Sequence, residues 1–218
     1  KFGNELFVRR TDHSPCNVVA WHGTYSPFKY DLKPLVAYHE NDAADPPPTM
    51  FYQSVKTMMG SGDPSSKSGL AIHMYSFSAD MSGGTDPAYM YNSDGDFLFM
   101  PQLGSLLILT EMGRLVVHPT EICVIPRGIV FSVNIHHTAD DDDEPKARGY
   151  MLEIFKGHFV LPELGPIGSN GLGNPRDFLY PTAWYEKDVT PGVPGGVHII
   201  NKFGNELFVR RTDHSPCN

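Results

Sequence analysis

The sequence has few cysteines, and their pattern excludes a disulfide-stapled scaffold. The three are Cys16, Cys123 and Cys217, with no C-x-x-C pair among them. No secretory signal stands at the start, where Lys1 looks like an internal residue, so we interpret the cysteines as reduced thiols of a cytoplasmic protein. Cys123 lies in the apolar run Ile122–Ile125 and is expected in the core.

The chain also lacks clustered positive charge and long apolar runs. Its net charge is −8, and its 17 Lys and Arg residues are scattered, so no basic patch offers binding to nucleic acid. No apolar run approaches the roughly 20 residues that span a bilayer. We therefore expect neither a nucleic-acid partner nor a membrane partner.

What the sequence does have is many turns between short strands. Its 21 Gly and 19 Pro favour β structure over helix. Residues 69–77 alternate with a period of two, which places Ala71, His73, Tyr75 and Phe77 on one face. Further strands are expected over residues 5–9, 104–110, 114–118, 121–125, 129–135, 148–155 and 197–200. The prediction is a mainly β fold, a cupin-like jelly roll or β-sandwich with long Gly/Pro loops and little helix.

Three further local features are predicted. Residues 51–59 predict one weak helix that ends at the turn residues 60–64. Asp94-Gly95 predicts a tight hairpin or bulge turn with a strand after it. From Pro101 the strands are expected to follow one another as a β-meander.

Several histidines and carboxylates are candidate metal ligands, and none is assigned to a site. His22 beside Trp21 and His73 on its strand are interpreted as packing residues rather than as ligands or bases. The pair His136-His137, next to the acidic loop 139–145, is interpreted as a solvated hairpin tip. His118 and Glu121 flank a turn, but the cupin pattern G-x5-H-x-H-x3-4-E-x6-G is absent.

A calcium loop is also excluded by the spacing. The oxygens of Asn92, Asp94 and Asp96 resemble the start of an EF-hand loop, but Leu103 stands at the twelfth position, where such a loop needs Glu. We therefore predict no catalytic, cofactor-binding or metal-binding residue in this chain.

One 17-residue sequence, KFGNELFVRRTDHSPCN, occurs twice, as residues 1–17 and again as 202–218. Structural repeats recur several times and diverge, so a single perfect copy at each end is not a solenoid. Recent duplication, exon scrambling, a circular message read past its origin, or an assembly error would each produce it. We expect the C-terminal copy to dock, because it continues from the preceding strand, and the two copies to compete for one strand position.

The repeat implies that Val18 also follows Asn218 in the parent order. The chain is then a cyclic reordering of one contiguous segment. On this interpretation residues 1–36 are a displaced segment that belongs downstream of the second copy, residues 37–50 are a junction, and residues 51–218 are the jelly-roll domain. Residues 18–36 are expected to be poorly anchored.

The stretch 161–181, LPELGPIGSNGLGNPRDFLYP, combines Gly and Pro with apolar anchors. This composition is typical of an ordered loop pinned onto a core rather than of a tether. Either it is a structural loop at the rim of the β-domain, or it shapes a pocket or a subunit contact.

Five stretches resemble the homogentisate 1,2-dioxygenase family. They are GPIGSNGLGNPRDF (165–178), in which the family usually has Ala at position 173, NSDGDFL (92–98), EICVIPRGIVFSV (121–133), GSGDPSSKSGLAIH (60–73) and NVVAWHGTYSPFKYDL (17–32). The last of these belongs downstream in the family, as the reordering requires. Residues 37–50 and 139–145 show no resemblance.

The resemblance implies a cytoplasmic Fe(II) enzyme of tyrosine and phenylalanine catabolism. Such an enzyme opens the ring of homogentisate with O2 to give maleylacetoacetate and assembles as a hexamer. Its iron is held by two His and one Glu, and these ligands lie beyond the segment that ends at Leu32. None of these roles is therefore given to His22, His39 or any other histidine here, and this chain alone is expected to bind no iron.

Three hypotheses follow. The chain is a segment of a homogentisate dioxygenase, or a non-catalytic cupin-like module for binding or oligomerisation, or its order is an artefact of a gene model.

Overall fold

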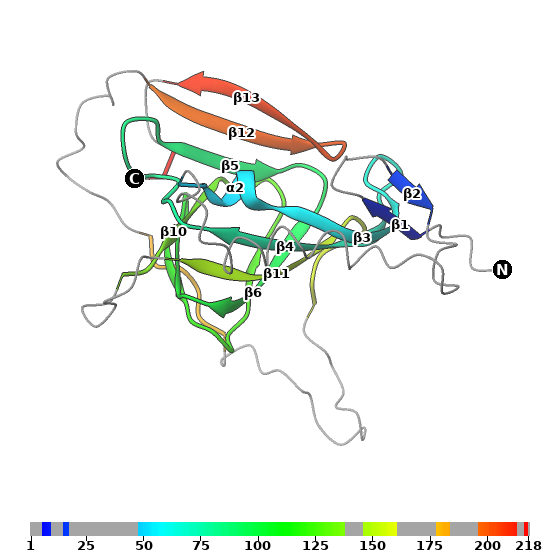
Figure 1. Ribbon diagram of the computed structural model, residues 1–218, viewed down its shortest axis with the longest axis horizontal. Coiled ribbons are helices and arrows are strands. Elements are labelled where there is room, and N and C mark those ends of the chain that lie inside the picture. Colours follow the sequence, from blue (N-terminus) through cyan, green and yellow to red (C-terminus); the bar gives the residue numbers. More distant parts are fainter. Residues whose placement is uncertain are drawn as a thin grey trace, which may run out of the picture.

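The computed structural model describes residues 6–9, 15–17, 48–137, 146–160, 178–183, 196–212 and 216–217, with backbone alone for 6–9 and 15–17. These residues form two β-sheets and one helical turn (Figure 1). The elements are β1 (Leu6–Arg9), β2 (Pro15–Asn17), α2 (Phe51–Ser54), β3 (Lys56–Asp63), β4 (Ser68–Phe77), β5 (Ala88–Asn92), β6 (Asp96–Leu103), β7 (Leu106–Thr110), β8 (Gly113–Val117), β9 (Cys123–Ile125), β10 (Phe131–Ile135), β11 (Ala147–Ile154), β12 (Val197–Phe203) and β13 (Glu206–Thr212).

The strand order is that of a jelly roll. One sheet runs β2-β1-β3-β4-β11-β6-β9 and the other β13-β12-β5-β10-β7-β8. The eight strands from β4 to β11 divide into β4-β11-β6-β9 and β5-β10-β7-β8, and every pair within these two sets is antiparallel. Two four-stranded sheets connected in this way are the double Greek key of a jelly roll. The prediction of a mainly β jelly roll with little helix is confirmed.

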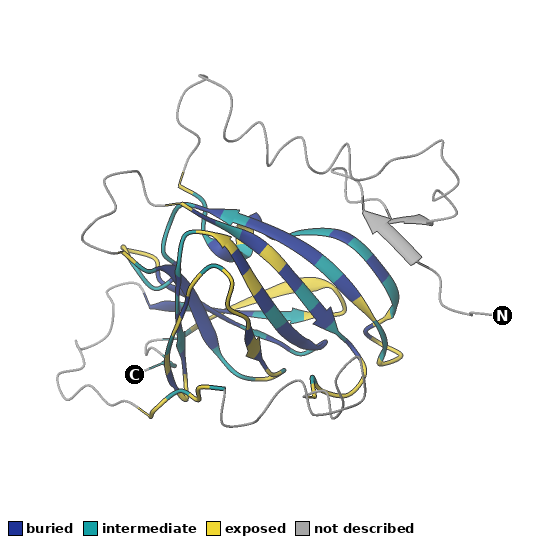
Figure 2. Cartoon of the chain, turned by 90° about the horizontal axis from the view of Figure 1, so that it is seen from below, coloured by how far each residue is buried: buried dark blue, intermediate teal, exposed yellow. Residues whose placement is uncertain are grey.

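The core lies between the two sheets and is filled with aromatic rings. On β4 the predicted inward face is confirmed, because Ala71, His73, Tyr75 and Phe77 are all buried. Figure 2 shows this alternation of buried and less buried positions along the strands. Neighbouring ring centroids lie 5.4 to 6.4 Å apart. The interlocking rings are Phe51, Tyr75, Phe77, Phe97, Phe99 and Phe131.

The predicted helix over residues 51–59 is wrong beyond its first turn. Only Phe51–Ser54 is helical, and Lys56–Asp63 forms β3 along β4. A long antiparallel ladder outweighs the weak helical pattern. Gly62 and Gly69, both with positive φ, do not stop a helix but let the two strands approach, because a Cβ on either would meet backbone atoms of the other strand.

The predicted meander is wrong, and the turn at Asp94-Gly95 does not form a hairpin, although a strand follows it as predicted and the other strands lie close to their expected positions. β9 leaves β8 and pairs with β6 in the other sheet, before β10 returns to pair with β7. β5 and β6, on either side of Asp94-Gly95, likewise belong to different sheets. The even spacing of strands indicates their number but not the sheet that each one joins.

The two copies of the repeat occupy different strand positions. The second copy contributes the end of β12, a two-residue turn and β13, and it continues from the preceding strand as predicted. In the first copy, Leu6 and Phe7 of β1 pair with Ser61 and Gly60 of β3, in the other sheet. The expected competition for one position is therefore not what the structure shows, because each copy has its own edge (Figure 1).

Candidate functional site

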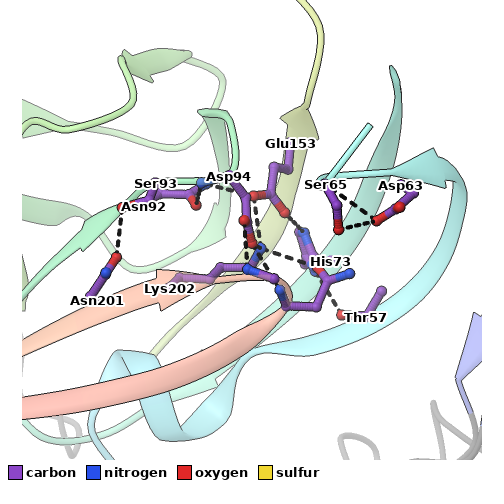
Figure 3. Close-up of polar contacts among 12 residues, drawn as sticks. Thr57, Asp63, Ser65, His73, Asn92, Ser93, Asp94, Glu153, Asn201 and Lys202 are labelled. Atoms are coloured by element: carbon purple, nitrogen blue, oxygen red, sulfur yellow. Dashed lines mark hydrogen bonds and ion pairs between the residues drawn. The ribbon is translucent and has the colours of Figure 1, made fainter. Parts of the chain in front are cut away.

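The strongest concentration of buried charge lies where β4, β11 and β12 approach the turn between β5 and β6. Figure 3 shows this group, which we call the buried charge cluster. It consists of His73, Asn92, Asp94, Glu153 and Lys202. Its members come from both sheets, so the cluster joins the jelly roll to the C-terminal hairpin.

His73 and Glu153 form its innermost pair. Both side chains are inaccessible to solvent, at 1% and 0% exposure. His73 Nε2 lies 3.0 Å from Glu153 Oε2, while His73 Nδ1 lies 3.0 Å from the hydroxyl of Thr57 on β3. The second oxygen of Glu153 accepts a hydrogen bond from the Asn92 amide at 2.6 Å. Both ring nitrogens of His73 are therefore engaged within the protein.

Lys202 joins this pair to Asp94. Its ammonium lies 2.9 Å from Glu153 Oε1 and 2.8 Å from Asp94 Oδ2. The carboxylate of Asp94 also accepts the backbone N–H groups of Gly204 at 2.7 Å and Asn205 at 2.9 Å. The buried carboxylate of Asp94 thus holds both residues of the turn between β12 and β13 through their backbone N–H groups.

The surroundings hold Glu153 ionised. Burial by itself raises the pKa of a carboxyl, but the hydrogen bond to His73 and the charge of Lys202 outweigh it and lower the pKa of Glu153 to about 2. A buried carboxylate is tolerated here because each of its oxygens has a hydrogen-bonding partner and Lys202 supplies a positive charge.

A second group lies beside the cluster, where the chain leaves β11. Asp96 is 1% exposed and accepts bonds from the backbone and side chain of Arg127 at 3.0 and 3.2 Å and pairs with His158 at 2.9 Å. Burial opposes ionisation of Asp96, yet these bonds lower its pKa. Arg127 also donates to the carbonyls of Phe155 and Gly157. These contacts fix the chain just before residues 161–177.

Neither group is suited to bind a metal ion. No set of three or more His, Cys, Asp or Glu side chains in the described residues is arranged as a metal site. At the buried pair of His73 and Glu153, the ammonium of Lys202 already contacts the carboxylate that a metal ion would need. The interior of the jelly roll contains the aromatic rings described above.

The structure separates the other predicted residues. His118 lies 2.9 Å from the Ser105 hydroxyl and its ring is 6.1 Å from that of His136, while His137 lies 3.8 Å from Asp80. Of the three residues that resemble the start of a calcium loop, Asn92 and Asp94 belong to the buried charge cluster, whereas Asp96 bonds with Arg127 and His158 instead.

Of the cysteines, Cys123 is buried as predicted, and burial raises the pKa of its thiol to about 12. Cys217 is half-buried, with its Sγ 3.5 Å from the Val130 carbonyl.

Some predictions fall outside the described residues. These are the side chain of Cys16, His22, His39, the acidic loop 139–145 and residues 161–177 of the Gly/Pro loop. Among the described residues, no helix has the length and apolar character to cross a membrane.

Sequence reasoning missed Glu153 and Lys202. His73 is interpreted from the sequence as a packing residue, and its carboxylate partner, Glu153, lies 80 residues further along the chain. One signal was present, since Glu153 occupies an inward position of β11, in step with the buried Met151. A carboxylate at an inward position of a strand requires a buried partner.

The comparisons with known proteins agree with one another. The family model described as "Homogentisate 1,2-dioxygenase N-terminal" matches residues 1–32 and 37–218. This range includes residues 37–50 and 139–145, in which the sequence alone showed no resemblance. The human homogentisate 1,2-dioxygenase is 48% identical over 168 residues, covering 77% of this chain and 34% of that protein. The Drosophila melanogaster protein of the same name is 44% identical over 216 residues, covering 98% of this chain and 42% of that protein.

Similar solved structures include a cupin superfamily protein from Desulfitobacterium hafniense, at 11% identity and a TM-score of 0.34, covering 47% of this chain and 76% of that one. A cupin-2 domain protein from Shewanella frigidimarina, at 14% identity, has a TM-score of 0.31 and covers 39% and 70%. The family model and the curated relatives decide the assignment. The chain spans about a third of the length of the human relative, corresponds to its N-terminal part, and belongs to the homogentisate 1,2-dioxygenase N-terminal family.

Proposed function

We propose that the intact protein is a homogentisate 1,2-dioxygenase, which uses Fe(II) and O2 to open the ring of homogentisate to maleylacetoacetate. In this proposal the present chain is the N-terminal jelly roll, which supports a catalytic part that it does not itself contain. The observation that carries it is the 44–48% identity to curated relatives of that name. The alternative function is a non-catalytic cupin-like module for binding or oligomerisation.

The packing of the barrel supports the proposal that this chain alone holds no iron. A non-haem iron centre of two His and one carboxylate needs open coordination positions for O2 and substrate. The buried pair of His73 and Glu153 offers none, because both nitrogens of His73 are bonded and Lys202 contacts the carboxylate.

The test compares the 218-residue chain with the complete product of its gene. We expect the complete product to contain iron and to consume O2 only when homogentisate is added, and an iron chelator to abolish this uptake. The 218-residue chain should have neither property. Stoichiometric iron in the 218-residue chain would contradict the claim about the chain. A complete product that contains no iron and consumes no O2 would favour the binding module.

We also propose that residues 1–36 are a displaced segment, residues 37–50 a junction and residues 51–218 the jelly-roll domain. The family model matches residues 1–32 separately from residues 37–218, which supports a break between these two parts of the chain. Sequencing the messenger RNA across the Asn17–Val18 and Leu35–Thr49 junctions tests it. A message that contains both junctions as given would establish that the order is real and not an artefact.

The intact protein is proposed to be a cytoplasmic homo-oligomer, a hexamer as the family resemblance implies. Fractionation of cells and the solution mass of the complete product test these two statements.

A further inference from the structure

Of the described strands whose burial is known, β13 is the most exposed to solvent. β13 lies at the end of its sheet and, among the described strands, pairs only with β12. Leu207, Phe208 and Val209 are 47%, 52% and 59% exposed, although all three are strongly apolar. Figure 1 shows β13 as the outermost strand, beyond β12. An apolar strand with a free edge is a template for pairing with another strand.

This edge is held in a fixed position. Gly204 and Asn205 have φ values of 61° and 62°, which is the geometry of a two-residue type I′ hairpin. Both backbone N–H groups are bound by the buried carboxylate of Asp94. Lys202 ties the same turn to Glu153. The hairpin is therefore presented as a rigid edge rather than as a loose arm.

The turn also determines which groups of β13 face outward. In a two-residue hairpin the residue after the turn donates its N–H to the residue before it, here Glu206 to Phe203. Backbone groups then alternate along an antiparallel strand. Those of Glu206 and Phe208 point to β12, and those of Leu207 and Val209 point away from the sheet.

We propose that this edge pairs with β13 of a second copy of the chain, antiparallel and centred on Phe208. In this register Leu207 faces Val209 of the second copy, and their outward backbone groups exchange hydrogen bonds. Phe208 then faces its own copy across the two-fold axis, and Glu206 faces Arg210. The six-stranded sheet would continue across the dimer, as in strand-addition complexes.

Charge selects this register over its nearest alternative. A dimer centred on Val209 satisfies the same backbone alternation but places Phe208 opposite Arg210 and Glu206 opposite Thr212. Only the register centred on Phe208 gives two symmetric Glu206–Arg210 pairs beside an apolar centre. Opposite charges directly across an antiparallel pair attract, and like charges repel. The strand is therefore self-complementary in one register.

Charge reversal tests this directly. In sedimentation velocity we expect the 218-residue chain to be a dimer or a larger assembly built from dimers. Glu206→Arg and Arg210→Glu should each raise the dimer dissociation constant about tenfold, because two attractive pairs become repulsive. The double variant E206R/R210E should restore it. Glu5→Arg and Arg9→Glu, in the identical first copy, serve as matched controls and should leave the mass unchanged.

Cross-linking tests the register. Residues facing each other in a non-hydrogen-bonded antiparallel pair are close enough for a disulfide. Mild oxidation of the Phe208→Cys variant should give a 208–208 cross-linked dimer, located by mass spectrometry, and Phe7→Cys should not. A monomeric wild-type chain, single reversals without effect, a double variant that fails to recover, or cross-linking through position 7 would each overturn the proposal. None of these readouts depends on homogentisate, so they stand apart from the proposed activity.

Discussion

The ammonium of Lys202 lies between the carboxylates of Glu153 and Asp94, at 2.9 and 2.8 Å. Lys202 is the first residue of the second copy of the repeat, and both carboxylates belong to the jelly roll. These two ion pairs therefore attach the second copy of the repeat to the jelly roll at the first residue of that copy. The identical Lys1 carries the same chemistry at the other end of the sequence.

Removal of this charge should destabilise the fold. Lys202→Met keeps the aliphatic stem but leaves Glu153 and Asp94 without their counter-charge in a buried position. Breaking a buried ion pair by removing one partner costs about 3 to 5 kcal/mol, and we expect a loss in that range in urea unfolding.

The repeat provides a matched control for this experiment. Lys1→Met makes the same change in the same local sequence, and we expect a loss under about 1 kcal/mol, because Glu153 and Asp94 are occupied by Lys202. If Lys202→Met and Lys1→Met lowered the free energy of unfolding equally, the ion pairs with Glu153 and Asp94 could not be assigned to the second copy.

Acid should unfold the protein through Glu153. Its pKa falls from an ordinary 4.5 to about 2 on folding, so the unfolded state takes up the proton first. Its contribution to stability is complete above pH about 4.5 and is lost as the pH falls towards 2. Urea unfolding followed from pH 6 to pH 2.5 should show this decline.

A Glu153→Gln variant separates the contribution of Glu153 to the pH dependence of stability from that of the other carboxylates. It should be less stable at neutral pH and should lose less stability on acidification than the wild type. Some acid sensitivity should remain, because Asp96 also has a lowered pKa. An unchanged pH slope in the variant would show that Glu153 is not the group responsible.

Tyr75 carries a buried hydroxyl that makes no hydrogen bond within the described structure. Burial of this group raises the pKa of Tyr75. Replacing it with Phe removes an unsatisfied polar atom and keeps the ring, so Tyr75→Phe should raise stability by about 1 kcal/mol. Thr110→Val is the contrasting variant. The Thr110 hydroxyl donates to the Gly113 carbonyl at 2.8 Å, so removing this hydroxyl should destabilise the protein. Thermal unfolding of both variants gives the comparison, and a destabilised Tyr75→Phe would contradict the account.

Much of the fold could be predicted from the sequence, because alternation is a local signal. The inward face of 69–77 and the strand positions between 104 and 155 follow from it. The sheet that each strand joins does not, because it is decided by pairings such as that of β9 with β6 across more than 20 residues of sequence. The family resemblance rests on extended motifs and was therefore accessible from the sequence.

The buried charge cluster was not predictable in the same way. His73, Glu153 and Lys202 come from three strands far apart in the chain, and no spacing between them is set by local structure. What the sequence offered was an inward carboxylate on β11 without a visible partner. Such a residue indicates that a partner exists and leaves its identity to the tertiary fold.

Gly149 is required where β11 crosses the ring of Tyr75. A Cβ at this position would meet the Tyr75 hydroxyl and would lie 2.5 Å from the carbonyl oxygen of Met100. Gly149→Ala should therefore destabilise the protein by about 2 kcal/mol or more, since backbone cannot move aside cheaply. Gly83→Ala is the control, because its Cβ would meet only Asp80, at 3.3 Å, and thermal unfolding should find it near neutral. The double variant Y75F/G149A lacks the clash with the Tyr75 hydroxyl but keeps the clash with the Met100 carbonyl. It should therefore be more stable than Gly149→Ala and less stable than the wild type. A fully stable Gly149→Ala protein would mean that β11 and Tyr75 do not pack in this way.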